Sequence, residues 1–197
     1  MGLREAKKER TREALVEAAV RLFEEKGYER TTVAQIAAAA QLSTRTFFLH
    51  FAAKEDVLLA NSVPRVDLGV AALGDRRPGE TPGDALLRAI GAMVADASAK
   101  DLPTGLAAAR ARLVATEPAV QARLLQRMAT AQTALADALH HAYPDELDPV
   151  AAAAVAGAAI GAVSAAAVVA LRHGLPPAQV REAMLKAPAT AATHLPK

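Results

Sequence analysis

The residues of this chain best suited to chemistry are Ser43, Thr44, Arg45 and Thr46, which stand together at the expected start of a short helix. Short polar side chains at the N-terminal end of a helix can reach base edges and phosphates when that helix enters the major groove of DNA. An arginine can pair bidentately with guanine, and a threonine methyl group can pack on a thymine methyl group. This run therefore predicts nucleic-acid recognition.

Two further residues, His50 and Lys54, follow this run closely enough to bracket a phosphate. Backbone N–H groups at the helix starts expected near Val33 and Lys54 could also receive phosphate oxygens, because the free amides and the helix dipole favour anions there. We interpret Thr32 and Ser43 as the N-caps of two helices, a role that each would have even without DNA.

No comparable set of residues predicts catalysis or a metal site. The chain has no cysteine, and none of its four serines or five histidines stands in a recognisable catalytic motif. His140 and His141 are adjacent, so on a helix they would diverge by about 100° and make a poor metal pair. We therefore expect no enzyme activity, no cofactor and no metal.

The elements that must position the polar run form a helix-turn-helix. Apolar residues recur at helical spacing over about residues 5–26, and Gly27 ends that helix. Thr32 caps a second helix over about 33–39, and Ser43 opens a third through about Leu49. The two caps lie eleven residues apart, which leaves room for a short helix, a tight turn and a new helix start.

Five of the six aromatic residues fall in or beside this region, and only Tyr143 follows it. Phe47 and Phe51 lie four residues apart and therefore share a helix face. We expect them, with Ile36 and Tyr28, to form the core of a small N-terminal domain.

The rest of the chain is expected to be helical as well, so the predicted fold class is all-α. A helix should open at Lys54 and run to about Ser62, where Pro64 would kink or end it. Further helices are predicted to about Leu73 and over about 83–99, 105–116, 118–142, 149–173 and 177–194. We expect a DNA-binding domain over 1–54 and a larger helical domain over 55–197.

Charge is distributed unevenly between these two parts. Residues 1–54 carry ten Lys and Arg against seven Glu, a net +3, whereas the remainder has a net charge of −1. A modest basic bias is compatible with a surface that faces nucleic acid. The charged stretch from Arg4 to Arg12 fits either a solvated, frayed arm or an extension that follows DNA, and the sequence does not separate the two.

The segments that carry a family resemblance are GYERTTVAQIA and AAQLSTRTFFLHFAAKEDVL. They closely resemble the N-terminal DNA-binding domain of the TetR family of bacterial transcriptional regulators, over about residues 10–60. The resemblance implies an all-helical homodimer with a variable ligand-binding domain, and DNA contacts from Thr32, Ser43, Thr44, Arg45, Thr46, Phe48, His50 and Lys54. Phe48 replaces a common tyrosine and Leu49 a frequently polar or aromatic residue, so fewer polar DNA contacts are expected there.

The run from Val150 to Leu171 has no charged residue and is long enough to span a bilayer. It is mostly alanine and flanked by amphipathic helices, so we expect no membrane segment. Because relatives in the family dimerise through their last two long helices, the resemblance makes about 149–173 and 177–194 the expected homodimer interface.

A pocket for a small effector, if present, should lie between about residues 65 and 172, and the scarcity of aromatic residues favours an aliphatic ligand. The candidate lining residues are Met93, Leu106, Arg110, Leu113, Leu124 and Met128. The leading hypothesis is a cytoplasmic, ligand-responsive repressor that binds a palindromic DNA operator as a homodimer. The alternative is a DNA-binding dimer that has no effector or is gated by a partner.

Overall fold

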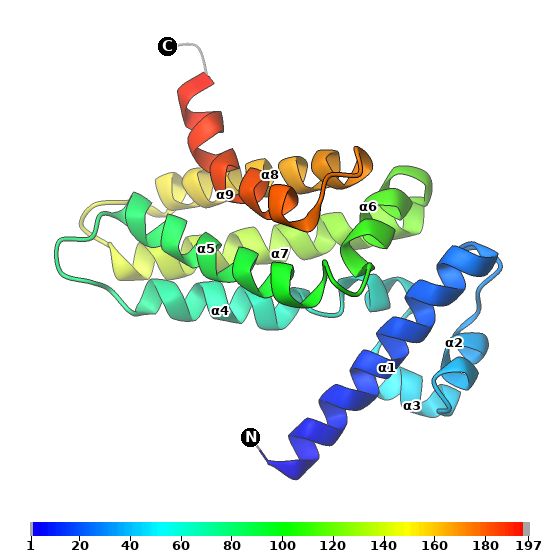
Figure 1. Ribbon diagram of the computed structural model, residues 1–197. Coiled ribbons are helices and arrows are strands. Elements are labelled where there is room, and N and C mark those ends of the chain that lie inside the picture. The colour runs from blue at the N-terminus through cyan, green and yellow to red at the C-terminus, as the bar shows by residue number, and fades with distance from the viewer. Residues whose placement is uncertain (1, 195–197) are drawn as a thin grey trace. The chain divides into compact units, whose positions relative to one another are not determined.

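The structure, a computed structural model, describes residues 2–194, and within this range all regular secondary structure is helical (Figure 1). The all-α prediction is therefore confirmed. The elements are α1 Leu3–Lys26, α2 Val33–Ala39, α3 Thr44–His50, the 3-10 helix η1 Lys54–Leu59, α4 Ser62–Gly74, α5 Pro82–Lys100, α6 Leu106–Thr116, α7 Pro118–Ala142, α8 Pro149–Arg172 and α9 Pro177–His194.

The predicted helix after Lys54 and the expected effect of Pro64 were wrong in detail. Lys54–Leu59 forms a 3-10 helix, and Pro64 lies in the first turn of α4 rather than at the end of a helix. The first backbone hydrogen bond of α4 runs from the Arg65 N–H to the Asn61 carbonyl at 3.2 Å. Pro64 lies before the donor of that bond, at a position where the helix needs no backbone N–H. The proline therefore does not disrupt α4.

The helices form two compact units. The first contains the described residues up to Ala60 together with Thr104–Leu124, and the second contains Asn61–Pro103 and the described residues from Leu125 onward. Each has its own apolar core. The division into a DNA-binding domain over 1–54 and an effector domain over 55–197 is a functional statement and stays a prediction.

In the second unit, α4 packs on α5, α5 on α9, and α8 on α9. At Gly69, α4 approaches its neighbours so closely that a Cβ atom would lie 2.7 Å from the Met93 sulfur and 2.9 Å from a methyl carbon of Leu135. Atoms do not approach so closely without displacement, so a larger residue at Gly69 would push Met93 or Leu135 aside.

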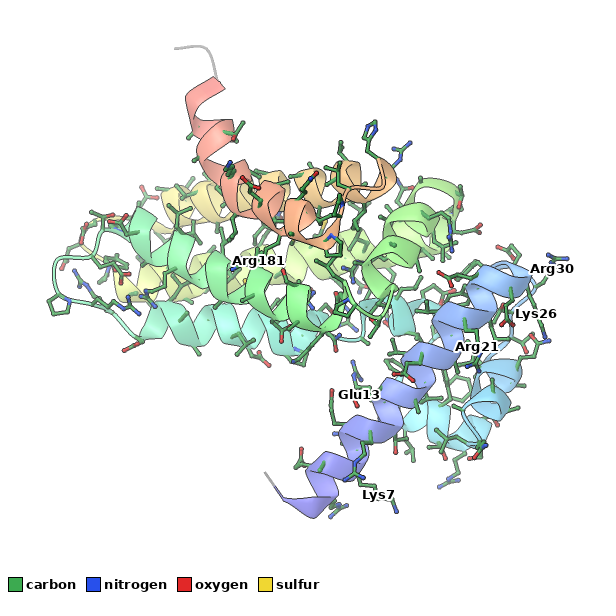
Figure 2. The ribbon with its side chains drawn as sticks, in the orientation of Figure 1. Lys7, Glu13, Arg21, Lys26, Arg30 and Arg181 are labelled. Carbon is green, nitrogen blue, oxygen red and sulfur yellow. The ribbon has the colours of Figure 1, made fainter. Side chains whose placement is uncertain are left out.

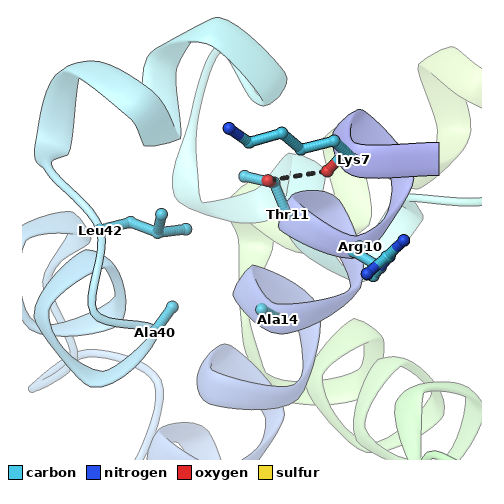
Figure 3. Close-up of a pocket in the computed structure, with 6 residues that line it drawn as sticks. All are labelled: Lys7, Arg10, Thr11, Ala14, Ala40 and Leu42. Atoms are coloured by element: carbon cyan, nitrogen blue, oxygen red, sulfur yellow. Dashed lines mark hydrogen bonds between the residues drawn. The ribbon is translucent and has the colours of Figure 1, made fainter. Parts of the chain in front are cut away.

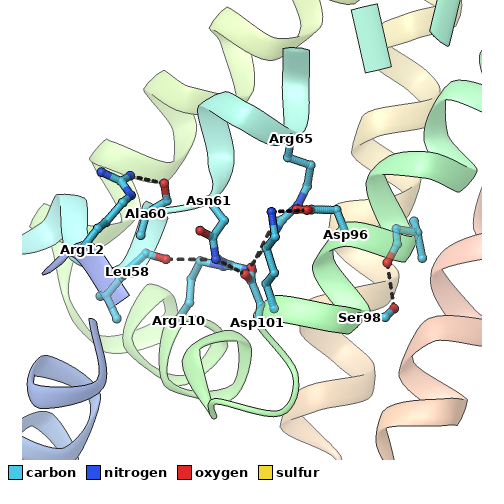
Figure 4. A network of polar contacts seen from close by, with 11 residues as sticks. Arg12, Leu58, Ala60, Asn61, Arg65, Asp96, Ser98, Asp101 and Arg110 are labelled. Carbon is cyan, nitrogen blue, oxygen red and sulfur yellow. Dashed lines mark hydrogen bonds and ion pairs between the residues drawn. The ribbon is translucent and has the colours of Figure 1, made fainter. Parts of the chain in front are cut away.

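A buried ion-pair network joins the start of α4 to the end of α5 (Figure 4). Arg65 donates two hydrogen bonds to Asp101, at 2.9 and 3.0 Å, and one to Asp96 at 3.1 Å. Asn61 also donates to Asp101 at 2.8 Å, and Lys100 pairs with Asp96 at 2.6 Å. Asp101 is fully buried, so these donors stabilise a carboxylate removed from water.

Two segments, Lys54–Gly74 and Pro149–Arg172, are long and apolar enough to cross a membrane by length and composition. The first is not one continuous helix, because η1 ends at Leu59 and α4 begins at Ser62. Apolar helices of soluble proteins pass the same test, so this is weak evidence for a membrane. The expectation of no membrane segment stays a prediction.

Candidate nucleic-acid interface

Helix α2 begins with the cap that the sequence predicted. The Gln35 N–H donates to the Thr32 hydroxyl at 3.2 Å, and the Gln35 side-chain oxygen accepts from the Thr32 N–H at 3.0 Å. This reciprocal capping box fixes the start of α2. It also engages the Thr32 hydroxyl within the protein, although the side chain remains exposed.

The turn between α2 and α3 is tight and depends on Gln41, the one non-glycine residue with positive φ in the described range, at 58°. The Leu42 N–H then donates to the Ala37 carbonyl at 2.8 Å. Polar residues such as glutamine reach this left-handed conformation only at a cost, so the surrounding hydrogen bonds must hold it. The turn sets the direction in which α3 leaves.

Ser43 caps α3, as predicted, by accepting a hydrogen bond from the Thr46 N–H at 3.1 Å. The Ser43 and Thr46 hydroxyls also lie 2.9 Å apart and bond to each other. The two residues therefore serve first to hold the helix start. Thr44 and Arg45 are exposed, so they are the polar residues of α3 freest to reach DNA.

The other face of α3 is anchored in the first core, as the sequence predicted. Phe47 is completely buried and Phe51 nearly so, with ring centroids 5.6 Å apart, and Ile36 and Tyr28 are buried in the same core. Phe48 and Leu49 point outward instead, 58% and 72% exposed. Adjacent residues on α3 therefore have different roles. One packs into the core, and the next two place apolar side chains on the exposed surface.

Lys54 makes contacts within the protein in this structure. Its ammonium donates to the carbonyls of Tyr28 and Thr31, at 3.0 and 3.2 Å, and lies 3.9 Å from the centre of the Tyr28 ring. Lys54 starts η1 whereas His50 ends α3, so the two do not share one helix face. Lys54 links the loop after α1 to η1. A DNA contact from it stays a prediction.

His50 is half-buried at the end of α3, and its Nδ1 atom has no hydrogen-bond partner among the described residues. Burial, with the nearby charges of Arg12 and Lys8, lowers the pKa of His50 below its ordinary value. Arg12 itself donates to the carbonyls of His50 and Ala60 and stacks 4.6 Å from the centre of the Phe51 ring. The nearby carboxylate of Glu9 acts in the opposite direction and raises the pKa of His50, but burial and the two cations outweigh it.

Helix α6 and the start of α7 contact the first unit's N-terminal segment, although they lie far from it in sequence. These contacts were not predicted from the sequence. Arg110 donates to the Leu58 carbonyl at 3.1 Å (Figure 4), and Arg123 forms two bonds with the buried Asp56, at 2.7 and 2.8 Å. Leu106 and Leu113 also join the core beneath α1. No local pattern signals these long-range contacts, since they join residues more than fifty positions apart.

The residues predicted to line an effector pocket are divided between the two units. Leu106, Arg110, Leu113 and Leu124 belong to the first unit, and Met93 and Met128 to the second. Both methionines are partly buried against the second core. Because Leu106 and Leu113 are core residues of the first unit, an effector pocket in the second unit would draw on Met93 and Met128. A ligand site formed by these residues stays a prediction.

No group of three or more His, Asp or Glu side chains suited to a metal occurs in the described part of the chain. His140 and His141 bond to different carbonyls, those of Leu147 at 2.8 Å and Asp137 at 3.1 Å.

Residues 15–60 match the family model described as "Bacterial regulatory proteins, tetR family". The chain is 41% identical over 129 residues to the HTH-type transcriptional regulator TcmR of Streptomyces glaucescens, a match that covers 64% of this chain and 57% of TcmR. It is 30% identical over 88 residues to the uncharacterized HTH-type transcriptional regulator YerO of Bacillus subtilis (strain 168), over 43% of this chain and 30% of YerO. The chain thus spans little more than half of TcmR and less than a third of YerO.

The fold is also shared with solved structures at low sequence identity. A TetR-family regulator from Syntrophomonas wolfei matches with a TM-score of 0.68 and 16% identity, covering 95% of this chain and 97% of that one. SmeT in complex with triclosan matches with a TM-score of 0.61 and 19% identity, over 93% and 90%.

Residues 15–60 carry the N-terminal domain of the tetR family of bacterial regulatory proteins. The resemblance inferred from the sequence is therefore confirmed. The match identifies in this chain a helix-turn-helix DNA-binding domain of the kind found in transcriptional regulators. The matched residues, 15–60, contain α2, α3 and their turn and lie wholly within the first unit.

Proposed function

We propose that the protein is a cytoplasmic, ligand-responsive repressor that binds a two-fold symmetric operator as a homodimer. The observation that carries the proposal is the division of α3, whose buried Phe47 fixes the helix while Thr44 and Arg45 stay exposed at its N-terminal end. Such a helix can lie in the major groove with those side chains at the base edges.

The proposal of a homodimer is supported by the surface of α8. This helix has a mean hydropathy of 2.2 over its most apolar window, yet only 22% of that window is buried within one chain. Val155 and Val169 are substantially exposed on it. A second copy of α8 and α9 would remove this apolar surface from water, with the exposed Glu182–Lys186 ion pair of α9 at the rim.

The proposal of a small effector is supported by the second core, which is built mainly from aliphatic residues. Within it the Tyr143 hydroxyl is buried and has no hydrogen-bond partner among the described residues. An unpaired buried hydroxyl is costly, so a ligand with one acceptor and an aliphatic body would suit this core. SmeT, which shares the fold, has been solved with a bound small molecule, triclosan.

The identity of the operator can be tested by selecting bound duplexes from a random DNA pool with the full chain. A two-fold symmetric site is expected, with half-sites about one helical turn or slightly more apart. Recovery of only asymmetric sites would contradict the homodimer. A screen for small molecules that raise the melting temperature and release the selected DNA would then separate an effector-responsive repressor from an effector-free one.

Arg45→Ala is expected to weaken operator binding by about 1–3 kcal/mol for each half-site, roughly 5- to 150-fold per half-site, and to relax the preference at one base position of each half-site. The reason is that a base-edge contact discriminates between sequences, whereas a phosphate contact does not. Affinity for the selected operator and its single-base variants measures both effects. Arg21→Ala is the matched control, since Arg21 is another exposed arginine of the first unit (Figure 2). An equal loss on every duplex would show that Arg45 does not contact bases.

Operator affinity is expected to rise as the pH falls below about 6.5, and His50→Asn should abolish that rise. In the free protein, burial and the charges of Arg12 and Lys8 lower the pKa of His50. A bound phosphate would raise that pKa, so the complex would hold the proton more tightly than free protein does.

The measurement is affinity at about pH 7.5 and about pH 5.5 at constant ionic strength. The same lowered pKa means that unfolded protein binds the proton better, so the fold loses stability as the pH falls through this range. A melting curve at each pH must therefore show folded protein. An unchanged pH dependence in His50→Asn would contradict the role of His50.

A further inference from the structure

A hollow lies between α1 and the turn that joins α2 to α3 (Figure 3). It has a volume of about 540 Å³, opens to solvent, and is lined by Lys7, Arg10, Thr11, Ala14, Ala40 and Leu42. All six residues belong to the first unit. Lys7 and Arg10 lie on α1, outside the helix-turn-helix to which the predicted DNA contacts belong.

The wall on α1 is one helix face, because its four residues follow the spacing i, i+3, i+4 and i+7. Two of them are cations, and Thr11, which follows Arg10, donates a hydrogen bond from its hydroxyl to the Lys7 carbonyl at 2.9 Å. The Lys7 side chain extends from α1 over the hollow toward the turn that carries Leu42 (Figure 3). The lining of the hollow therefore combines two basic side chains with the apolar side chains of Ala14, Ala40 and Leu42.

The cations of α1 have different tasks. Arg12 is engaged in the fold, through the carbonyls of His50 and Ala60. Lys7 and Arg10 are exposed, and neither side chain forms a hydrogen bond or an ion pair within the described residues. Two unpaired positive charges on one helix face, next to a hollow, indicate an anionic partner from outside the chain.

The place of the hollow identifies the partner. Its opposite wall, Ala40 and Leu42, flanks Gln41 in the turn, and Leu42 directly precedes Ser43, the cap of α3. A duplex whose major groove received the start of α3 would carry its backbone close to this turn. Double-stranded DNA presents one negative charge per about 1.7 Å of axis, so an open hollow beside a helix face with two cations suits a phosphate backbone better than a free anion.

We propose that Lys7 and Arg10 bind backbone phosphates of the operator at the edge of each half-site, with one phosphate seated in the hollow. The proposal rests on the proposed DNA-binding function and adds a second contact surface to α3. These contacts would position the protein on the duplex without reading its sequence. Of the two sequence-based interpretations of the Arg4–Arg12 stretch, this one is the extension that follows DNA.

The test compares the salt dependence of operator binding in wild-type protein and in the double variant Lys7→Ala/Arg10→Ala. Because the homodimer carries both substitutions twice, four phosphate contacts are lost. The slope of log affinity against log salt should become shallower by about 3.6, and binding should weaken roughly 100- to 1,000-fold near physiological salt, equally on the operator and its single-base variants. Arg21→Ala is the control on the same helix, about 16 Å along the axis from Arg10. It should leave the slope unchanged.

A second arm shortens the duplex from both ends until the outermost phosphates are lost. Wild-type protein should then fall to the affinity and slope of the double variant, while the double variant is insensitive to the shortening. The wild-type protein and the double variant should have the same circular dichroism melting curve, because Lys7 and Arg10 are exposed. This result would exclude unfolding as the cause of the lost affinity.

Three results would overturn the proposal: an unchanged slope in the double variant, an equal change in Arg21→Ala, or equal sensitivity of both proteins to shortening. If in addition Arg45→Ala still relaxes base preference, the proposed function stands and only this inference fails. If wild-type protein binds no duplex even at low salt, the proposed function itself fails.

Discussion

Phe47→Ala is expected to destabilise the first unit by about 3–5 kcal/mol, whereas the same change at the adjacent residue, Phe48→Ala, should leave its stability nearly unchanged. Phe47 is completely buried and Phe48 is 58% exposed. Truncating Phe47 removes apolar contacts with Phe51 and leaves a cavity, while truncating Phe48 removes a side chain that is mostly in water.

The measurement is urea unfolding followed by circular dichroism, with operator affinity determined under conditions where each variant is folded. Phe48→Ala is the control for truncation of a phenylalanine on α3. Any effect it has should appear in DNA affinity, since Phe48 lies on the exposed surface of α3. Equal stability of the two variants would mean that the assignment of core and exposed faces on α3 is wrong.

Arg65→Ala is expected to destabilise the second unit by about 3–5 kcal/mol, because it removes the cation that pairs with two buried carboxylates. Asp101 loses two charge-assisted hydrogen bonds and Asp96 loses one. Removing one partner of a buried ion pair is costly because the remaining charge keeps its desolvation penalty. The expected result is an unfolding transition at clearly lower urea concentration.

Arg77→Ala is the matched control, since Arg77 is an exposed arginine in the loop between α4 and α5 of the same unit and lies outside the proposed dimer helices. It should shift the transition by less than about 0.5 kcal/mol. Adding Asp101→Asn to Arg65→Ala should recover part of the loss, because a neutral amide has a smaller desolvation cost than a carboxylate. Equal stability of Arg65→Ala and Arg77→Ala would show that the network does not stabilise the unit.

Local sequence signals located most of the helices. Thr32 and Ser43 both cap helices as predicted, and α2 and α7 have the predicted bounds. Capping residues and prolines act within one turn of the backbone, so a sequence records them directly. The core of the first unit was also predictable, because Phe47 and Phe51 share a face by spacing alone.

Signals that depend on tertiary contacts were not predictable in this way. Nothing near Arg123 indicates that it pairs with Asp56, and nothing near Lys54 indicates that its ammonium binds the carbonyls of Tyr28 and Thr31. The Ser43 and Thr46 hydroxyls bond to each other, which leaves fewer polar groups of α3 available to DNA. The residue types alone do not indicate this bond. Side-chain partners chosen by the folded chain decide which polar residues remain available to DNA.

The first unit is built from two separate stretches of sequence, the described residues up to Ala60 and Thr104–Leu124. This has a consequence for engineering. A chimeric regulator made by grafting the first sixty residues onto another effector domain would leave behind Leu106, Leu113 and the Arg123 partner of Asp56. The grafted segment would expose part of its apolar core, and the buried carboxylate of Asp56 would lose its ion-pair partner. A working chimera must include α6 and the first turns of α7 together with the DNA-binding helices.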